Sequence, residues 1–298
     1  MGTAHDNQQT TDKRTVAVIG AGVSGLTSAY ILATQCNVTI YEAEPRLGGH
    51  AHTHDVVDPA GNLLAVDTGF IVHNDRTYPQ LRRLFAELDV HTRPTGMSMS
   101  IRDVPSGVEF AGGRGVSGIF AQRRRAFDPR FLSMLAEVKR FQLLAKTFLE
   151  RTDDRDQTAY GQFLRAHRFS SRFIRLYAVP VVSCVWSMGT AAALDYPARY
   201  LFRFLSNHGM LAVTGSPQWY TVVGGSRTYV DAIASRLPQV RAGKSVVEVL
   251  RDDQGVLVKD SSGRWIHFDS VVIATHADQA LELLADASVA EKEVLGAF

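Results

Sequence analysis

The sequence predicts an α/β fold in which a second domain of mixed helices and strands is inserted into the first. Residues 15–42 have the pattern of a strand, a glycine turn, a helix and a second strand. Near the other end, residues 246–275 contain four short β-rich runs separated by turn residues. Longer apolar patterns of helical period lie between these parts. We therefore expect residues 1–13 to be a disordered lead. Residues 14–96 and 221–298 should form a discontinuous first domain, and residues 97–220 an inserted second domain.

The first strand, Thr15–Ile19, leads into a turn with three regularly spaced glycines. Gly20, Gly22 and Gly25 form the pattern G-x-G-x-x-G at the start of a helical segment, Val23–Ala33. In a dinucleotide site the first glycine permits the tight turn and the second leaves room for a pyrophosphate. The third lets the helix pack closely on the strand. The alternative is a glycine turn that binds no ligand.

The start of this helix and a following acidic residue complete the pattern of a nucleotide site. Backbone N–H groups around Ser24, together with the positive end of the helix dipole, are suited to bind phosphates. The second strand, Asn37–Tyr41, ends at Glu42, about twenty residues after Gly20, where a carboxylate accepts hydrogen bonds from a ribose diol. Glu42 therefore predicts an adenosine with a free 2′-hydroxyl. These residues alone do not distinguish NAD from FAD.

The residues after the second strand distinguish the two cofactors. Glu42, Arg46, Gly48 and Gly49 resemble the E-x-x-x-R-x-G-G signature of FAD-containing amine oxidases and of their relatives, the phytoene desaturases and protoporphyrinogen oxidases. Arg46 would offer a planar donor fork to the pyrophosphate. The glycine pair would let the backbone approach the flavin. The alternatives are a solvated arginine and an ordinary loop. The resemblance implies a Rossmann-like FAD-binding domain with an inserted α+β substrate domain.

Further stretches extend this resemblance along nearly the whole chain from residue 15. A hairpin around Asp58–Gly61 returns to Asp67-Thr68-Gly69, and the family's D-x-G element passes beside the flavin, which implies a contact at Gly69. The resemblance also implies that the backbone of Val246 meets adenine. The pattern W-x-x-V-x-G-G-S-x-x-Y-V from Trp219 is similar to a bacterial branch of NAD/FAD-binding, amine oxidoreductase-like proteins. Members often neighbour cyclopropane fatty acid synthase-like methyltransferases, which implies a lipid acyl substrate.

The other elements follow from periodicity and turn residues. We expect a hairpin with its turn at Pro105–Gly107. Helices are expected at Thr77–Asp89, Phe131–Phe148, Arg227–Leu237 with Ser226 as its cap, and Ala277–Ala285. Of the four late β runs, three are expected to form a small meander. The fourth, Val271–Thr275, is expected to rejoin the parallel sheet.

Histidines and aromatic residues suggest further sites. The pattern His50, His52, His54 can ligate zinc or copper, but no acidic or cysteine partner stands in a fixed relation to it, so we assign no metal and expect His50 near the cofactor. His208 is either an acid–base group or structural, and we assign no catalytic side chain. Six residues can line an apolar pocket or simply fill a core: Trp186, Phe202, Phe204, His208, Trp219 and Tyr220.

Composition narrows the class of protein and its location. The chain is 45% hydrophobic with a formal charge of +2 and shows no basic face suited to nucleic acid. Its two cysteines provide no disulfide framework, and the polar N-terminus has no signal-peptide pattern, so we expect a cytoplasmic protein. The uncharged stretch Leu176–Leu194 is long enough to span a membrane, but Pro180 and Gly189 interrupt it and favour a buried segment. The run Arg123–Arg125 is either a solvated loop or a contact for anionic lipid headgroups.

The predicted function is FAD-dependent oxidation of a small molecule or lipid, with hydride passing from a substrate C–H bond to flavin N5. The substrate is an acyl chain or an amine. Two alternatives stay open. The resemblance implies that relatives continue into a C-terminal segment that this chain lacks, which suggests an incomplete or non-catalytic FAD-binding subunit completed by a partner chain. The second alternative is an NAD-dependent dehydrogenase, which would share the glycine turn but leave Arg46, Gly48 and Gly49 unexplained.

Overall fold

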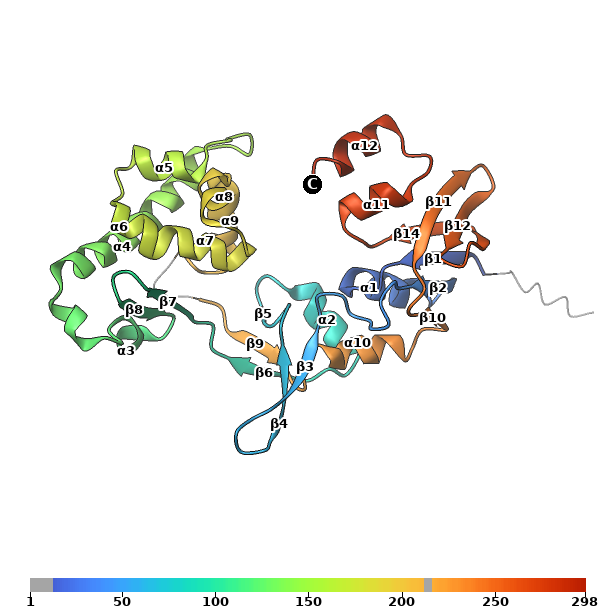
Figure 1. The fold of residues 1–298 in the computed structure, drawn as a ribbon, viewed down its shortest axis with the longest axis horizontal. Helices are drawn as coiled ribbons and strands as arrows, with labels where there is room; N and C mark the ends of the chain where they lie inside the picture. The colour runs from blue at the N-terminus through green and yellow to red at the C-terminus, as the bar shows by residue number, and fades with distance from the viewer. Residues whose placement is uncertain (1–12, 212–215) are drawn as a thin grey trace, which may run out of the picture. The chain divides into compact units, whose positions relative to one another are not determined.

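A computed structural model describes residues 13–211 and 216–298, which fold as two compact units (Figure 1). Unit 1 comprises the described residues as far as Val72, together with Gln80–Arg93 and Thr221–Phe298. Unit 2 comprises His73–Pro79 and Pro94–Tyr220. The short segment 73–79 thus groups with unit 2, whereas the sequence pattern placed it in the first domain. The expected disordered lead lies outside the described residues except for Lys13.

Unit 1 is built on a four-stranded sheet in which every neighbouring pair is parallel. Its order is β10-β2-β1-β14, with Ile19 of β1 opposite both Tyr41 and Ile273. The expected first two strands and the return of the last β run to this sheet are confirmed, although that strand ends two residues earlier than expected. Strand β10 was not predicted. The bounds are β1 Thr15–Ile19, β2 Asn37–Tyr41, β10 Gln239–Arg241 and β14 Ser270–Ile273.

Both faces of this sheet are covered. Val16 and Val18 of β1 belong to a core with helices α1 (Val23–Leu32) and α10 (Arg227–Ala234). The alternate residues, Ala17 and Ile19, pack on the opposite side against the late β meander. This explains why β1 reads as a continuous apolar run, since a parallel strand is buried on both faces.

The remaining elements of unit 1 agree with most of the expected ones. The late runs form the antiparallel meander β11-β12-β13, and the hairpin around Asp58–Gly61 forms β3 and β4. Helix α12 was not expected from the sequence. The bounds are β3 Thr53–Val57, β4 Leu63–Asp67, α2 Pro79–Glu87, β11 Val246–Asp252, β12 Gly255–Asp260, β13 Trp265–Phe268, α11 Ala277–Leu283 and α12 Val289–Leu295.

Unit 2 is mainly helical and contains the two-stranded sheet β7-β8. A second small sheet has the order β5-β9-β6, and two residues each of β6 and β9 belong to the sequence ranges of unit 1. The hairpin expected around Pro105–Gly107 is β7–β8, and the expected long helix is α4. The bounds are β5 His73–Asn74, β6 Thr92–Thr95, β7 Met99–Asp103, β8 Val108–Gly112, α3 Gly115–Ile119, η1 Arg123–Phe127, α4 Pro129–Arg151, α5 Tyr160–Ala166, α6 Ser171–Phe173, η2 Ile174–Ala178, α7 Val179–Trp186, α8 Thr190–Asp195, α9 Ala198–Asn207 and β9 Trp219–Val222.

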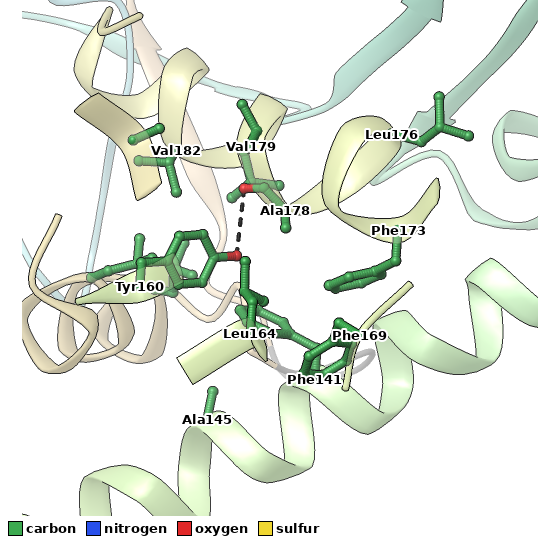
Figure 2. Close-up of a cluster of buried hydrophobic side chains, with 14 of the residues drawn as sticks. Phe141, Ala145, Tyr160, Leu164, Phe169, Phe173, Leu176, Ala178, Val179 and Val182 are labelled. Carbon is green, nitrogen blue, oxygen red and sulfur yellow. Dashed lines mark hydrogen bonds between the residues drawn. The ribbon is translucent and has the colours of Figure 1, made fainter. Parts of the chain in front are cut away.

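The core of unit 2 is centred on Phe141, which is 1% exposed (Figure 2). Six aromatic rings lie with their centroids 5.5–6.2 Å from that of Phe141, on Tyr160, Phe163, Phe169, Phe173, Tyr177 and Phe202. The Tyr160 hydroxyl donates to the carbonyl of Ala178 at 3.5 Å. The uncharged stretch from Leu176 forms short helices around this core, and no helix among the described residues is long and apolar enough to cross a membrane.

The buried Tyr229 allows a test of the packing in the core of unit 1. It is 1% exposed, and its ring lies 5.2 Å from that of Phe85. Among the described residues its hydroxyl makes no hydrogen bond of normal geometry, although the Ser226 side chain is near enough to oppose the rise in its pKa. Burial raises the pKa of Tyr229 to about 12. The pKa of an unfolded tyrosine is about 10, so above that pH the unfolded chain loses a proton that the folded chain keeps. The free energy of unfolding therefore falls as the pH rises from 10 to 12.

We expect Tyr229→Phe to be as stable as the unmodified chain at pH 7, or more stable by up to about 1 kcal/mol, because the change removes an unpaired buried hydroxyl. Above pH 10 the variant should lose less stability than the unmodified chain. Urea unfolding at pH 7 and pH 11 measures both effects, and Tyr200→Phe, at a 61% exposed tyrosine, is the control. A Tyr229→Phe protein that is clearly destabilised at pH 7 would show that the hydroxyl has a partner.

Candidate dinucleotide-binding site

The three glycines of the first turn have different structural reasons to be glycine. Gly20 has φ +95°, and a Cβ on Gly25 would lie 1.9 Å from the carbonyl oxygen of Gly20. These two positions are therefore fixed by the turn and by close packing of α1 on β1. Gly22 differs, because its backbone is extended (φ −68°, ψ 179°) and a Cβ there would meet no described atom within 4 Å. Nothing in the described protein itself requires glycine at this position.

Among the described residues, the first N–H groups of α1 beside Gly22 have no helical hydrogen-bond partner. Leu26 N–H donates to the Gly22 carbonyl at 2.9 Å, so the N–H groups of the preceding helical residues, including exposed Ser24, come before the first bond of the helix. The first turn of α1 contains no acidic residue. Together with the positive end of the helix dipole, this arrangement is suited to an anion.

Glu42 lies against the glycine turn. One carboxylate oxygen accepts from the Ala21 N–H at 2.7 Å and the other from the Glu44 N–H at 2.9 Å. The Glu42 carbonyl accepts from the Lys244 N–H at 2.8 Å, which ties the end of β2 to the segment before β11. The side chain is half-buried, and each oxygen keeps a further lone pair. Glu42 thus braces the turn and can still accept hydrogen bonds from a bound diol.

The glycine pair after β2 packs directly on the first turn. Gly48 N–H donates to the Ala21 carbonyl at 2.8 Å, and a Cβ on Gly49 would lie 3.1 Å from the Cα of Gly22. The guanidinium of Arg46 donates to the carbonyls of Leu47 at 3.0 Å and Gly49 at 2.9 Å. These donors brace the loop that carries the glycine pair. The expected contact between Arg46 and a pyrophosphate stays a prediction.

Asp67 is the centre of a polar cluster that sequence reasoning missed. Its carboxylate accepts from the Thr53 hydroxyl at 2.6 Å and from the Ser226 hydroxyl at 2.8 Å and N–H at 2.9 Å. Ser226 stands at the N-cap position of α10, as predicted, but its side chain makes no capping hydrogen bond, because the hydroxyl donates to Asp67. Gly69 is close to His50, since a Cβ there would lie 1.9 Å from the His50 carbonyl oxygen. A contact between Gly69 and flavin stays a prediction.

The other expected site residues of unit 1 are placed as follows. Val246 begins β11 and is 8% exposed. The ring of His50 stacks on that of His276 at 5.6 Å, and the rings of His52 and His54 lie 3.9 Å apart, as expected for alternate residues sharing one face. Among the described residues, no three His, Cys, Asp or Glu side chains are grouped to hold a metal.

In unit 2 the predicted aromatic set divides into two parts. Phe202 is fully buried in the core, whereas the ring of His208 lies between those of Phe204 at 3.9 Å and Trp219 at 6.1 Å. His208 Nδ1 is 2.8 Å from the Phe204 carbonyl oxygen and therefore carries a proton. In the neutral imidazole this makes Nε2 the acceptor. Asn74 lies opposite Trp219 in the β5–β9 pair, and its buried amide nitrogen has no partner among the described residues.

The parallel sheet of unit 1, with helices on one face, defines an α/β protein. Comparisons with known proteins identify its family. The sequence profile of the flavin containing amine oxidoreductases matches residues 23–295. The chain belongs to this family.

Solved structures show the same fold at low sequence identity. Cyclohexylamine oxidase from Brevibacterium oxydans IH-35A has a TM-score of 0.72 with 20% identity, over 95% of this chain and 63% of its own. A putrescine oxidase triple mutant has a TM-score of 0.71 with 15% identity and the same coverage. A CLA-producing fatty acid isomerase from P. acnes has a TM-score of 0.62 with 16% identity, over 96% of this chain and 64% of its own. The chain thus spans slightly less than two thirds of these proteins.

One curated relative matches a short stretch more closely. The tryptophan 2-monooxygenase of Allorhizobium ampelinum is 56% identical over 46 residues, which are 15% of this chain and 6% of that protein.

Proposed function

We propose that this chain is an FAD-dependent oxidoreductase whose unit 1 binds the cofactor and whose unit 2 binds the substrate. When bound, FAD would supply the hydride acceptor, flavin N5, for oxidation of a substrate C–H bond, and an acceptor such as oxygen would reoxidise the reduced flavin. The chain's own residues bind and orient the two molecules and exclude water. We assign no catalytic side chain.

The observation that carries the proposal is the open space at Gly22. Any residue could adopt the backbone conformation of Gly22, and its missing side chain leaves a gap beside a helix N-terminus. Such a position is suited to the close approach of a phosphate. Gly49 lies directly beside it. Residues that fit the extended cofactor are Gly20, Gly22, Ser24 and Gly25 for the pyrophosphate, Glu42 for the ribose, and Arg46, Gly48, Gly49, Gly69 and Val246 along its length.

Family membership favours flavin over NAD as the cofactor. For the substrate, we propose either an amine or the acyl chain of a lipid. Two groups beside Trp219 support a polar anchor for such a molecule in unit 2. The ring of His208 stacks on that of Trp219, and Asn74, opposite Trp219 in the β5–β9 pair, has an amide nitrogen with no partner among the described residues. Both cysteines are free, which supports a reducing compartment, and we propose that the protein acts in the cytoplasm.

The absorption spectrum of the freshly purified chain tests the cofactor. We expect flavin bands in the visible range and FAD on mass analysis of the released chromophore. A colourless protein that takes up no FAD on soaking would contradict the proposal, and protection by NAD alone would favour a dehydrogenase. A yellow protein that neither amines nor fatty acids bleach until a second polypeptide is added would identify an incomplete subunit that needs a partner chain.

A further inference from the structure

Three apolar side chains project from one part of unit 2. Phe127 at the end of η1 is 88% exposed, Val104 in the β7–β8 turn is 79% exposed, and Val116 in α3 is 73% exposed. In Figure 1, β7, β8 and α3 lie together in unit 2. We call these three exposed side chains the apolar tips.

Hydrogen bonds join the segments that carry these tips. The Gln122 amide donates to the Gly107 carbonyl at 2.8 Å, and its oxygen accepts from the Glu109 N–H at 3.3 Å. These bonds tie η1 to the β7–β8 hairpin. Helix α3 packs closely on β8, since a Cβ on Gly118 would lie 2.8 Å from the Ala111 carbonyl oxygen. The tips are therefore held on one assembled part of the fold.

The acidic residues in this part are all neutralised by partners. Asp103 pairs with Arg175 at 3.4 Å, Glu109 with Arg102 at 2.9 Å and Asp128 with Arg125 at 2.8 Å. Four other exposed arginines have no ion pair or side-chain hydrogen bond among the described residues: Arg114, Arg123, Arg124 and Arg130. This leaves an excess of positive charge on the segments that carry the three apolar tips, a combination that we call the arginine surface.

We propose that the arginine surface binds an anionic lipid bilayer. Arginines near an anionic leaflet are attracted to its surface potential, and single apolar side chains set among them can enter the boundary between headgroups and acyl chains. A protein partner would favour a larger continuous apolar area. Binding of single-stranded nucleic acid would favour aromatic platforms for stacking bases. The proposal does not depend on the cofactor or on the oxidation of any substrate.

Sedimentation of the full chain with vesicles tests the proposal. We expect binding to vesicles of equal parts phosphatidylcholine and phosphatidylglycerol, little binding to phosphatidylcholine alone, and weakening by salt. The double variant Arg123→Gln/Arg124→Gln should lower the partition coefficient about 25-fold, at about fivefold for each arginine. Phe127→Ser should weaken binding even where salt has screened the charges.

The matched control is Arg82→Gln/Arg83→Gln in α2 of unit 1, which removes the same net charge from a neighbouring pair elsewhere. It should leave vesicle binding within about twofold, and circular dichroism should show that every variant is folded. Equal weakening by both double variants would overturn the proposal, because net charge alone would then explain the binding. Strong binding to neutral vesicles, or to an oligonucleotide in preference to vesicles, would overturn it as well. Flavin content, measured on the same samples, should not change.

Discussion

Replacing Gly22 with aspartate is expected to abolish FAD binding while leaving the fold of unit 1 intact. Gly22 is the N-cap of α1 with extended backbone angles and open space around its missing side chain. Aspartate is among the best N-cap residues and exceeds glycine by only a few tenths of a kcal/mol, so the stability of the helix should stay about the same or rise slightly. The same carboxylate would place a negative charge where we expect the pyrophosphate. Like charges brought together cost several kcal/mol, which predicts a loss in affinity of about 100-fold or more.

Two further glycine variants separate charge and packing from this effect. Gly22→Asn has the size and capping ability of aspartate without the charge, so its loss of FAD affinity should be smaller. Gly25→Ala should instead destabilise the fold, because its Cβ would lie 1.9 Å from the Gly20 carbonyl oxygen. FAD titration followed by flavin fluorescence, with urea unfolding of each variant, distinguishes these outcomes. A Gly22→Asp protein that binds FAD as tightly as the unmodified chain would disprove the proposed site.

Replacing Phe141 with alanine is expected to destabilise unit 2 by about 3–5 kcal/mol. That is the usual cost of deleting a fully buried aromatic side chain, and Phe141 is 1% exposed with six aromatic rings around it. Figure 2 shows Phe141 on α4 facing Phe169 and Phe173. Because such a loss is comparable with the whole stability of many domains, we expect unit 2 of this variant to be partly unfolded at room temperature.

Urea unfolding followed by tryptophan fluorescence measures this loss, since Trp186 and Trp219 lie in unit 2. Leu143→Ala on the same helix is the control, because Leu143 is 60% exposed, and its effect should stay within about 0.5 kcal/mol. Phe141→Leu should fall between the two. A loss below about 1 kcal/mol for Phe141→Ala would mean that the aromatic cluster is not the core of unit 2.

The parts of the fold that sequence predicts well are those with strong local patterns. The G-x-G-x-x-G turn, the apolar run of β1 and the period of α4 each specify their structure within a few residues. Strand β10 carries no such signal, because its three residues follow Pro238 among turn residues. It becomes a strand only by pairing with β2, as in the Val240–Ile40 register. Tertiary pairing of this kind cannot be seen in a short segment.

In the candidate site, too, some features follow from local sequence patterns and others depend on the folded chain. The positions of Gly22, Glu42 and Gly49 beside one turn follow from spacing, whereas the direction of the Arg46 donors depends on the path of its own loop. Ser226 has the local signature of a helix cap, yet Asp67, 159 residues away in sequence, accepts its hydroxyl hydrogen. His208 is similar, because only the folded chain shows which of its nitrogens is committed to a carbonyl.

The pairing of β1 with β14 has a consequence for biosynthesis. The Thr15 N–H donates to a carboxylate oxygen of Asp269, 254 residues later, at the start of this pairing. At about 5–20 residues per second, a ribosome needs roughly 13–50 seconds to make the intervening chain. Throughout that time the edge of β1 that pairs with β14 has no partner strand. An unpaired edge of an almost wholly apolar strand promotes aggregation. We therefore expect the newly made chain to depend on chaperones until β14 has emerged from the ribosome.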